Sequence, residues 1–370
     1  MKVAIPRERQ AGEARVAATP DSVTKMVAKG LDVWVEAGAG ESAYFGDAAY
    51  REAGAKIAAD ESELYQGADV VLKVSPPGDD EIAKLPEGVT LLSFMQLGRN
   101  PQLPEKLAGR RAVGIALELL PRISRAQSMD ALSSQASLAG YKAVLLGADL
   151  LARVMPMQMT AAGTLVPAKV FVLGAGVAGL QSIATAKRLG AVVEAFDVRR
   201  AVKDEIESLG AKFVQLELEA AEGQGGYAAA QSEEYLARQR EMLTTHIAAS
   251  DLVVTTASIP LGKAPTLITT AMAESMKPGA VIVDLAAETG GNCELTQPGE
   301  AIVHNGVTIV GFTNLASRMA THASQTYARN LFNLLELMVS EGELKLDFED
   351  EIVRATCVTK DGEALWKPRS

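Results

Sequence analysis

The 370-residue chain has little of what marks several common classes of protein. It has two cysteines, Cys293 and Cys357, too far apart for a CxxC motif, and its three histidines show no metal-ligand spacing. This scarcity argues against a disulfide scaffold and against a zinc site, and it favours a reducing compartment. We therefore expect no metal ligands in this sequence.

An apolar segment of the length that a membrane span requires is also missing. A span takes about 20 apolar residues, and the most apolar long stretch, residues 139–165, is interrupted by Lys142, Asp149 and Arg153. Residues 2–6 already have the pattern of a strand, which predicts that no signal peptide precedes the fold. We expect a cytoplasmic protein without a membrane span of its own.

Basic residues are outnumbered by acidic ones, 36 against 46, and the formal net charge is −10. This balance argues against a general nucleic-acid-binding surface. Hydrophobic residues make up 48% and charged residues 22% of the chain, as in ordinary folded proteins. Because 370 residues exceed what one hydrophobic core usually organises, we expect two domains.

Short apolar runs typical of strands alternate with helical patterns in two series. The first series has such runs at residues 3–5, 31–36, 69–74, 89–95 and 112–120. The second series has them at residues 169–173, 191–196, 252–255, 280–285 and 307–310. This alternation is typical of parallel sheets that are covered by helices on both faces.

Long helical patterns at residues 137–155 and 317–340 flank the second series. The sequence therefore predicts an α/β protein with two doubly wound Rossmann-like domains with parallel sheets, linked by long helices. Residues 1–130 together with 320–370 would form the first, discontinuous domain, and residues 131–319 would form the second. Beyond the last long helix we expect short strands at 345–348 and 352–358 and a turn at 360–362.

The clearest motif is a glycine-rich turn directly after the run at residues 169–173. It reads Gly174-Ala175-Gly176-Val177-Ala178-Gly179, which fits GxGxxG and opens a helical pattern. Gly174 would allow a tight turn, Gly176 would let the backbone approach a pyrophosphate, and Gly179 would let helix and strand pack closely. The N–H groups at the start of the helix favour an anion. The motif predicts a dinucleotide-binding site.

Asp197 ends the next predicted strand and bears on the choice of dinucleotide. A carboxylate at this place accepts hydrogen bonds from the adenosine ribose and repels a 2′-phosphate. Arg199 and Arg200 leave NADP open, because a nearby arginine would receive that phosphate. Since the acid stands at the strand end, we interpret the site as one for NAD, with Val198 and Arg199 also among its residues.

Two further stretches differ from their surroundings in composition. Residues 122–133 are densely polar after an apolar run, and from composition alone they read as a solvated loop in which Asp130 or Ser133 caps the next helix. Residues 217–231 are rich in glycine and alanine, and the stretch includes a tyrosine, Tyr227. Loops of this length in compact domains usually act as lids or binding loops.

Taken together, the motifs resemble the alanine dehydrogenase/transhydrogenase family. The resemblance rests on residues 1–7, Glu13-Ala14-Arg15-Val16-Ala17, residues 122–133, residues 159–164, the glycine turn and Gly290-Gly291-Asn292-Cys293. It runs along essentially the whole chain, and residues 122–133 are its most discriminating part. Within the family, the sequence is similar to the NAD(H)-binding alpha subunits of proton-translocating NAD(P) transhydrogenases.

The resemblance implies a homodimer that lies peripherally at the cytoplasmic face of the inner membrane. It would dock on membrane-embedded transhydrogenase subunits and on a separate domain that binds NADP(H). Hydride would pass directly from NADH to NADP⁺, coupled to proton translocation by the membrane subunits. The catalytic residues would be Arg122, Gln127, Asp130, Ser133 and Tyr227. The cofactor contacts would include Ile123, Ser124, Gly226, Ala257 and Ser258 beside the glycine turn and Asp197.

The implied reaction needs no general acid or base, because hydride transfer between two nicotinamides moves no proton. It needs two rings at near-contact distance with water excluded. Arg122 and Asp130 would pair and hold the nicotinamide carboxamide or ribose. Gln127 would bridge to a ribose hydroxyl, since its amide both donates and accepts. Tyr227 would lie on a loop that closes over the nucleotide.

Two alternatives stay open at this point. An alanine dehydrogenase would use Arg15 and Lys73, which stand where the family's substrate-binding arginine and lysine are expected. Against it, Gln96 replaces the family's catalytic histidine, and Glu288 replaces its aspartate; a glutamine does no acid–base work at neutral pH. A non-catalytic NAD-sensing module would need only the glycine turn and the ribose acid, and the polar stretch at 122–133 argues against it.

Overall fold

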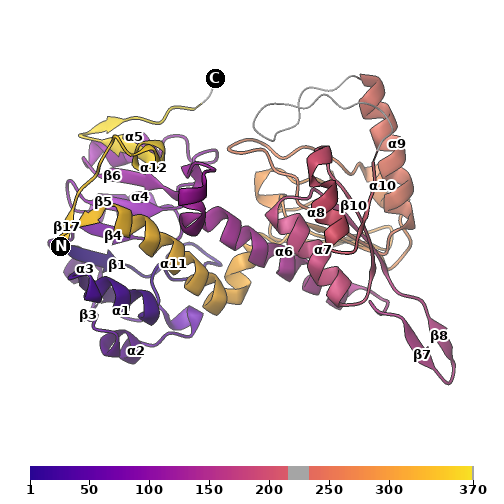
Figure 1. The fold of residues 1–370 in the computed structure, drawn as a ribbon, viewed down its shortest axis with the longest axis horizontal. Coiled ribbons are helices and arrows are strands. Elements are labelled where there is room, and N and C mark those ends of the chain that lie inside the picture. Colours follow the sequence, from indigo (N-terminus) through magenta and orange to yellow (C-terminus); the bar gives the residue numbers. More distant parts are fainter. Residues whose placement is uncertain (216–232, 369–370) are drawn as a thin grey trace. The chain divides into compact units, whose positions relative to one another are not determined.

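A computed structural model describes residues 1–215 and 233–368 of the chain. The predicted site residues Gly226 and Tyr227, with the rest of the glycine-rich stretch 217–231, lie outside the described residues. The chain divides into two compact units (Figure 1). The first unit is Met1–Gln135 with Ala316–Ser370, and the second is Ala136–Leu315.

The first unit is built on an eight-stranded sheet of order β19-β18-β6-β5-β4-β1-β2-β3. The strands are β1 (Lys2–Ile5), β2 (Asp32–Glu36), β3 (Lys56–Ala58), β4 (Val70–Leu72), β5 (Thr90–Ser93), β6 (Val113–Ala116), β18 (Cys357–Lys360) and β19 (Glu363–Ala364). Strands β1 to β6 pair in parallel, whereas β18 is antiparallel to β6 and β19 to β18. The parallel sheet expected from the apolar runs is therefore confirmed, with an antiparallel pair of strands at one edge.

Helices cover both faces of this sheet. They are α1 (Pro20–Ala28), α2 (Asp47–Glu52), α3 (Glu61–Tyr65), α4 (Asp79–Lys84), α5 (Leu103–Gly109), α11 (Ala320–Leu337) and α12 (Glu351–Thr356), with the 3-10 helices η1 (Glu41–Ala43), η2 (Leu117–Leu119), η3 (Ser124–Met129) and η7 (Leu315–Met319) and the small strands β16 (Val339–Ser340) and β17 (Glu343–Leu344). Val70 and Leu72 join the core on one face and Val71 joins the core on the other. This alternation explains why these strands are apolar throughout.

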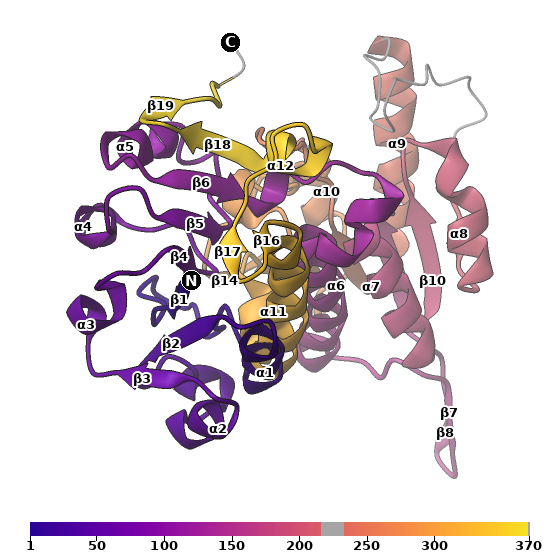
Figure 2. The ribbon, with the colours of Figure 1, turned by 60° about the vertical axis from the view of Figure 1, so that its left-hand side comes forward.

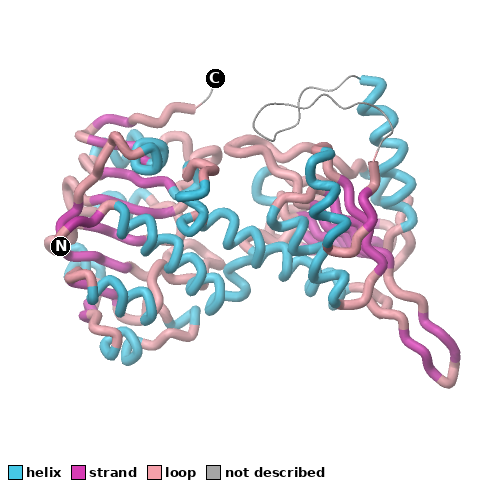
Figure 3. Tube along the Cα trace, in the orientation of Figure 1, coloured by secondary structure: helices cyan, strands magenta, loops and turns pink. Residues whose placement is uncertain are grey.

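The second unit repeats the plan with a seven-stranded sheet of order β11-β10-β9-β12-β13-β15-β14. Its strands are β9 (Lys169–Leu173), β10 (Val192–Phe196), β11 (Lys212–Phe213), β12 (Leu252–Thr255), β13 (Val281–Asp284), β14 (Ala301–His304) and β15 (Val307–Val310). All pairs are parallel except that of β14 with β15. As in the first unit, strands lie between helices (Figure 3).

The helices of the second unit frame its sheet. They are α7 (Val177–Arg188), α8 (Lys203–Ser208), α9 (Glu233–Ala249) and α10 (Thr270–Glu274), with η4 (Arg200–Val202), η6 (Ala287–Thr289) and most of α6 (Ala131–Leu150). A hairpin of β7 (Gln158–Thr160) and β8 (Gly163–Leu165) forms a separate two-stranded sheet. Figures 1 and 2 both show this hairpin standing away from the rest of the unit.

Two of the strands expected from the sequence were wrong. Residues 352–358 do not form one strand, because Asp350 accepts a hydrogen bond from Ile352 N (2.8 Å) and caps α12, so that β18 begins only at Cys357. Residues 345–348 are not a strand; the neighbouring β17 ends at Leu344. The expected turn at 360–362 is confirmed, since Asp361 and Gly362 have positive φ in the β18–β19 hairpin.

Candidate functional site

The carboxyl edge of the second unit's sheet gathers the residues that the glycine motif predicted. Four neighbouring parallel strands, β10, β9, β12 and β13, end there. The residues directly after them are Gly174, Asp197 and Thr256, and Asp284 is the last residue of β13. In doubly wound sheets, ligands bind outside this edge.

Two glycines of the turn are required by the fold itself. Gly174 has φ +98, in the left-handed region that favours glycine, and a Cβ on it would lie 2.6 Å from Thr256 Oγ1. A Cβ on Gly179 would lie 1.9 Å from the carbonyl oxygen of Gly174. Strand β9 and helix α7 therefore meet at a distance that only hydrogen atoms at these two positions allow.

Gly176 is different, because nothing in the described part of the chain requires it to be glycine. It is the N-cap of α7 with an ordinary φ of −75°, and a Cβ on it would meet no atom of the described residues within 4 Å. Among these residues, no side chain caps the first turn of the helix. Exposed N–H groups at a helix start, with open space before them, form an anion-binding place.

The other residues of the turn lie where this arrangement needs them. Ala175 is buried, and Val177 is 44% exposed at the first turn of α7. The Ala178 carbonyl faces α6, where a Cβ on Gly140 would come within 2.1 Å of it. Ser182 Oγ donates to the Gly140 carbonyl over 3.1 Å, so α6 fixes the start of α7.

Asp197 lies next to the glycine turn and is 9% exposed. Its Oδ2 accepts from Ala175 N (2.7 Å), so it also braces the turn. Its Oδ1 accepts from Arg199 N (2.8 Å) and Nε (3.0 Å), and Arg199 Nη2 reaches Oδ2 (3.0 Å). Val198 is half-buried between them, and Arg200 begins η4. The guanidinium of Arg199 therefore pairs with the acid beside it.

The loop after β12 contains Ala257, which is half-buried, and Ser258, which is exposed. Thr256 Oγ1 donates to the Gly174 carbonyl (3.0 Å) and ties this loop to the glycine turn. Ala257 is held by the buried side chain of Asn292, which stands in the family motif at residues 290–293 but for which the sequence suggested no role. No local pattern could have revealed this link across the sheet edge.

The polar stretch of residues 122–133 belongs, except for its last residues in α6, to η3 and its flanks in the first unit. Ala126 and Met129 are buried, whereas Arg122, Ser124 and Gln127 are exposed, and Ile123 is half-buried. Residues elsewhere in the first unit hold the backbone of η3 in place. Arg125 pairs with Asp350 through two bonds of 2.6 and 2.9 Å, and Nδ2 atoms of Asn330 and Asn333 on α11 donate to the Ser128 carbonyl. The exposed polar side chains thus stand on a fixed backbone.

Asp130 caps helix α6, one of the two alternatives that composition left open. Its Oδ1 accepts from Ser133 N (2.8 Å) and its Oδ2 from Ser133 Oγ (2.6 Å). This cap starts the helix at Ala131 rather than at residue 137, where the apolar pattern placed it. The expected pair between Arg122 and Asp130 stays a prediction.

The first unit holds a buried cluster of charges near the carboxyl ends of β1 and β4. Lys73 Nζ contacts Glu81 Oε1 at 2.7 Å and Glu8 Oε2 at 3.2 Å. Arg15 binds both carboxylate oxygens of Glu13 and donates to Gln135 Oε1 (2.9 Å). Burial would lower the pKa of Lys73, but the two carboxylates raise it above the ordinary value. These charges satisfy one another inside the unit.

Gln96 lies in a tight turn with φ +49. The Glu118 carboxylate holds this turn by accepting from Met95 N and Leu97 N, both at 3.1 Å, and burial raises the pKa of Glu118. Glu288, in η6 of the second unit, accepts from Asn314 N (2.8 Å). The Gln96 side chain has no titratable atom, so this position provides no proton-transfer group for an amino-acid dehydrogenase.

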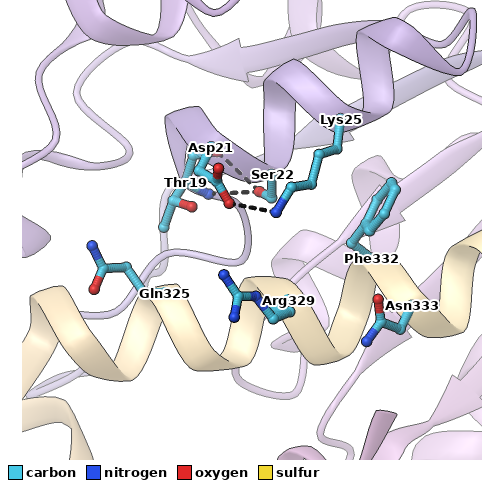
Figure 4. A pocket seen from close by; sticks show the side chains of 8 residues that line it. All are labelled: Thr19, Asp21, Ser22, Lys25, Gln325, Arg329, Phe332 and Asn333. Atoms are coloured by element: carbon cyan, nitrogen blue, oxygen red, sulfur yellow. Dashed lines mark hydrogen bonds and ion pairs between the residues drawn. The ribbon is translucent and has the colours of Figure 1, made fainter. Parts of the chain in front are cut away.

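Described residues of the first unit line two hollows. One, of about 670 Å³, is lined by residues 76–79, 99–103 and others including Arg9 and Lys106. The other, of about 230 Å³, lies between α1 and α11 (Figure 4). Within residues 1–215 and 233–368, no group of three or more His, Cys, Asp or Glu side chains is placed to hold a metal ion, and no helix is long and apolar enough to cross a membrane.

Comparisons with known proteins cover nearly the whole chain. The family described as "Alanine dehydrogenase/PNT, N-terminal domain" matches residues 4–139, and "Alanine dehydrogenase/PNT, C-terminal domain" matches residues 143–367. The first portion of the NAD(P) transhydrogenase alpha subunit of Rhodospirillum rubrum is 51% identical, covering 98% of this chain and 97% of that protein. A transhydrogenase structure from Sinorhizobium meliloti is 46% identical with a TM-score of 0.90, covering 99% and 100%. An L-alanine dehydrogenase structure, 23% identical with a TM-score of 0.83 over 99% and 97%, shares the fold.

Proposed function

The chain belongs to the alanine dehydrogenase/PNT family, and we propose that it is the NAD(H)-binding alpha subunit of a proton-translocating NAD(P) transhydrogenase. The observation that carries the proposal is Gly176, a glycine for which the described residues give no packing reason. The start of α7 behind it, which no described side chain caps, supports binding of the pyrophosphate of a dinucleotide.

The arrangement around Asp197 favours NAD(H) over NADP(H). The carboxylate stands at the strand end, where it would accept hydrogen bonds from the ribose hydroxyls. Arg199, the residue that would receive a 2′-phosphate, is paired with that carboxylate. Ala257 and Ser258 on the neighbouring loop would complete the contacts. NADP(H) would then be held by a separate partner domain, as in the implied assembly.

When bound, NADH supplies the hydride from C4 of its nicotinamide. The residues of the chain would position it: Gln127, Arg122 and Ser133 offer amide, guanidinium and hydroxyl groups on a backbone that η3 and α6 hold in place. Asp130 would act through Ser133, which it already holds. None of these groups needs to titrate, which suits a reaction that moves no proton.

The turn at Gln96 in the first unit supports the same choice between the two branches of the family. Amino-acid oxidation makes and breaks an imine and needs a proton-transfer group. Gln96 has no titratable atom, and its turn is fixed by the carboxylate of Glu118. We therefore do not propose amino-acid oxidation for this chain.

The proposed assembly is a homodimer that docks on membrane-embedded transhydrogenase subunits at the cytoplasmic face. The β7–β8 hairpin supports the dimer, because all six of its strand residues are exposed. Met159 is 83% exposed, and Met157, Leu165 and Val166 are also exposed. An isolated two-stranded hairpin is marginally stable in water, so a second copy of the chain is its most fitting cover.

The experiment mixes the purified chain with a transhydrogenase NADP(H)-binding domain and NADH, and it follows hydride transfer to NADP⁺. The proposal expects transfer that depends on both proteins. Oxidation of alanine by the chain with NAD⁺ alone would support the other branch of the family. NADH binding without transfer to any such partner would leave only a sensing module.

A further inference from the structure

The buried side chain of Asn292 clasps the loop after β12. Its Oδ1 accepts from Ala257 N (3.1 Å), and its Nδ2 donates to the Ala257 carbonyl (2.9 Å) and the Pro265 carbonyl (2.8 Å). The Asn292 carbonyl also accepts from Leu267 N and Ile268 N. Every polar atom of this 0% exposed amide is therefore engaged with the backbone of a single loop.

Asn292 is itself held by Asp284, the last residue of β13, which is 1% exposed. The Asp284 carboxylate accepts from five donors: the N–H groups of Ala286, Asn292 and Cys293 and the hydroxyls of Thr255 and Thr296. Charged hydrogen bonds of this kind are stronger than neutral ones and fix the acceptor firmly. The clasp therefore stands on a rigid base.

The two glycines before Asn292 allow the backbone to reach this position. Gly290 and Gly291 have φ of +106 and +78. A Cβ on Gly291 would lie 2.9 Å from Asp284 Oδ2, and one on Gly290 would lie 2.9 Å from Lys263 Cε. The double glycine thus makes the turn, and the asparagine after it makes the contacts.

An asparagine fits this place by its chemistry. One planar amide satisfies the N–H and the carbonyl of the same residue, Ala257, which requires an acceptor and a donor side by side. An aspartate has the same shape but would face two carbonyl oxygens with a negative charge. An alanine would leave three part-buried backbone groups, the N–H and carbonyl of Ala257 and the carbonyl of Pro265, without their partner, which costs free energy.

We propose that Asn292 is a positioning residue for nucleotide binding, acting through the loop after β12. The hydrogen bonds from Asn292 fix the backbone of Ala257 and therefore the direction of the chain at the next residue, Ser258. Through Thr256, whose hydroxyl bonds the Gly174 carbonyl, the same loop also braces the glycine turn. Asn292 itself is buried and touches no ligand. This inference rests on the proposed function, because it assigns Asn292 to the NAD(H) site.

The test measures NADH affinity by calorimetry and thermal stability for the full chain and for Asn292→Ala, Asn292→Asp and Asn292→Ser. The matched control is Asp251→Asn, which alters a 3% exposed carboxylate at the opposite edge of the same sheet, where it accepts from Lys169 N and Arg153. The control separates a general loss of stability from a loss of positioning.

We expect each Asn292 variant to raise the NADH dissociation constant about tenfold or more, with Asp affected at least as strongly as Ala. Hydride transfer at saturating NADH should stay within about threefold of the original rate, because the reacting groups are unaltered. Asp251→Asn should lower the melting temperature with little change in affinity. Unchanged affinity in a folded Asn292 variant, or an equal loss of affinity in the control, would overturn the inference.

Amide hydrogen exchange on the unaltered chain tests the clasp without any variant. Ala257 N–H should exchange slowly because it is bonded to a buried acceptor; rapid exchange would overturn the clasp. Failure of the unaltered chain to bind NADH would instead overturn the proposed function, and the inference with it. If the unaltered chain binds NADH and the folded variants bind it equally well, the inference alone fails.

Discussion

The two units have sheets of the same parallel design, yet their carboxyl edges carry opposite chemistry. In the second unit the edge presents backbone: the helix start behind Gly176, which no described side chain caps. Beside it lies Asp197, which is 9% exposed and paired with Arg199. In the first unit the corresponding region holds Lys73, Glu8 and Glu81 in a buried cluster. The helix start at the second unit's edge offers its N–H groups to an anion from outside, whereas the charges of the first unit's cluster are paired with one another.

This difference shows that the fold alone does not assign a function. A shared doubly wound sheet offers the same place at its carboxyl edge in both units, and the residues after the strands decide its use. The comparison predicts that altering the first edge changes stability and that altering the second changes nucleotide affinity.

The largest effect should follow from Lys73→Met in the first unit. Removal of the ammonium leaves Glu8 and Glu81 without their cation in a buried place, and breaking such pairs costs about 3–5 kcal/mol in the free energy of unfolding. Urea unfolding would measure this loss. The control is Lys25→Met, which removes the exposed ion pair with Asp21 and should change stability little. Equal stability of the two variants would contradict the account of the buried cluster.

Gln127→Asn tests the polar stretch of the first unit as a reaction surface. The variant shortens an exposed side chain, so fold and NADH affinity should persist. Hydride transfer in a single turnover should fall about 10²-fold, since small misplacements near reacting atoms are costly. The neighbouring exposed Ser128, whose carbonyl rather than side chain holds the turn, offers Ser128→Ala as a control. An undiminished rate for Gln127→Asn would remove this residue from the proposed site.

Asp197→Ala sharpens the comparison at the second edge. It should weaken NADH binding by about 1–3 kcal/mol, the scale of lost charged hydrogen bonds. Because the change also frees Arg199 from its carboxylate, NADPH should lose less affinity than NADH or gain some. Calorimetry with both nucleotides would decide; comparable NADH and NADPH affinities in the original chain would refute the assignment to NAD(H).

A smaller effect should appear with pH at Cys293, which lies beside the clasp. Burial raises the pKa of this thiol from 9.0 to about 11. The folded chain therefore holds the proton more tightly than the unfolded one. The resulting stability is present below pH 9 and is lost as the pH rises through about 11. Urea unfolding of Cys293→Ala should show a smaller loss of stability between pH 9 and about 11 than the original chain. An identical loss in both chains would contradict the raised pKa of the Cys293 thiol.

The sequence predicted the elements whose pattern is set locally. Strands buried on both faces appear as continuous apolar runs, and α1 follows from Thr19 and from Pro20 at its first position. The prediction of one strand at 352–358 was wrong because Ile352 and Val353 are residue types typical of strands. The N-cap at Asp350 instead starts helix α12 there. The exposed β7–β8 hairpin has no buried face to mark it in the sequence.

The candidate site was predictable to the extent that it is contiguous. The glycine turn and Asp197 lie within one βαβ unit, so spacing alone locates them. The Asp284–Asn292–Ala257 chain of contacts joins the end of β13 to two separate loops, and the Arg125–Asp350 pair joins residues that are far apart in the sequence. Contacts of this kind follow from tertiary packing, which no local pattern encodes.

The most direct test of the central claim is Gly176→Ala measured for both stability and NADH affinity, beside Gly179→Ala. At Gly176 a methyl group meets no described atom within 4 Å and φ is ordinary, so the melting temperature of Gly176→Ala should not fall. At Gly179 the methyl group would overlap the Gly174 carbonyl, so the melting temperature of Gly179→Ala should fall. The account predicts that Gly176→Ala nevertheless weakens NADH binding about tenfold or more, because the methyl group takes the space of the pyrophosphate. A Gly176→Ala chain that is stable and binds NADH as tightly as the original would contradict it.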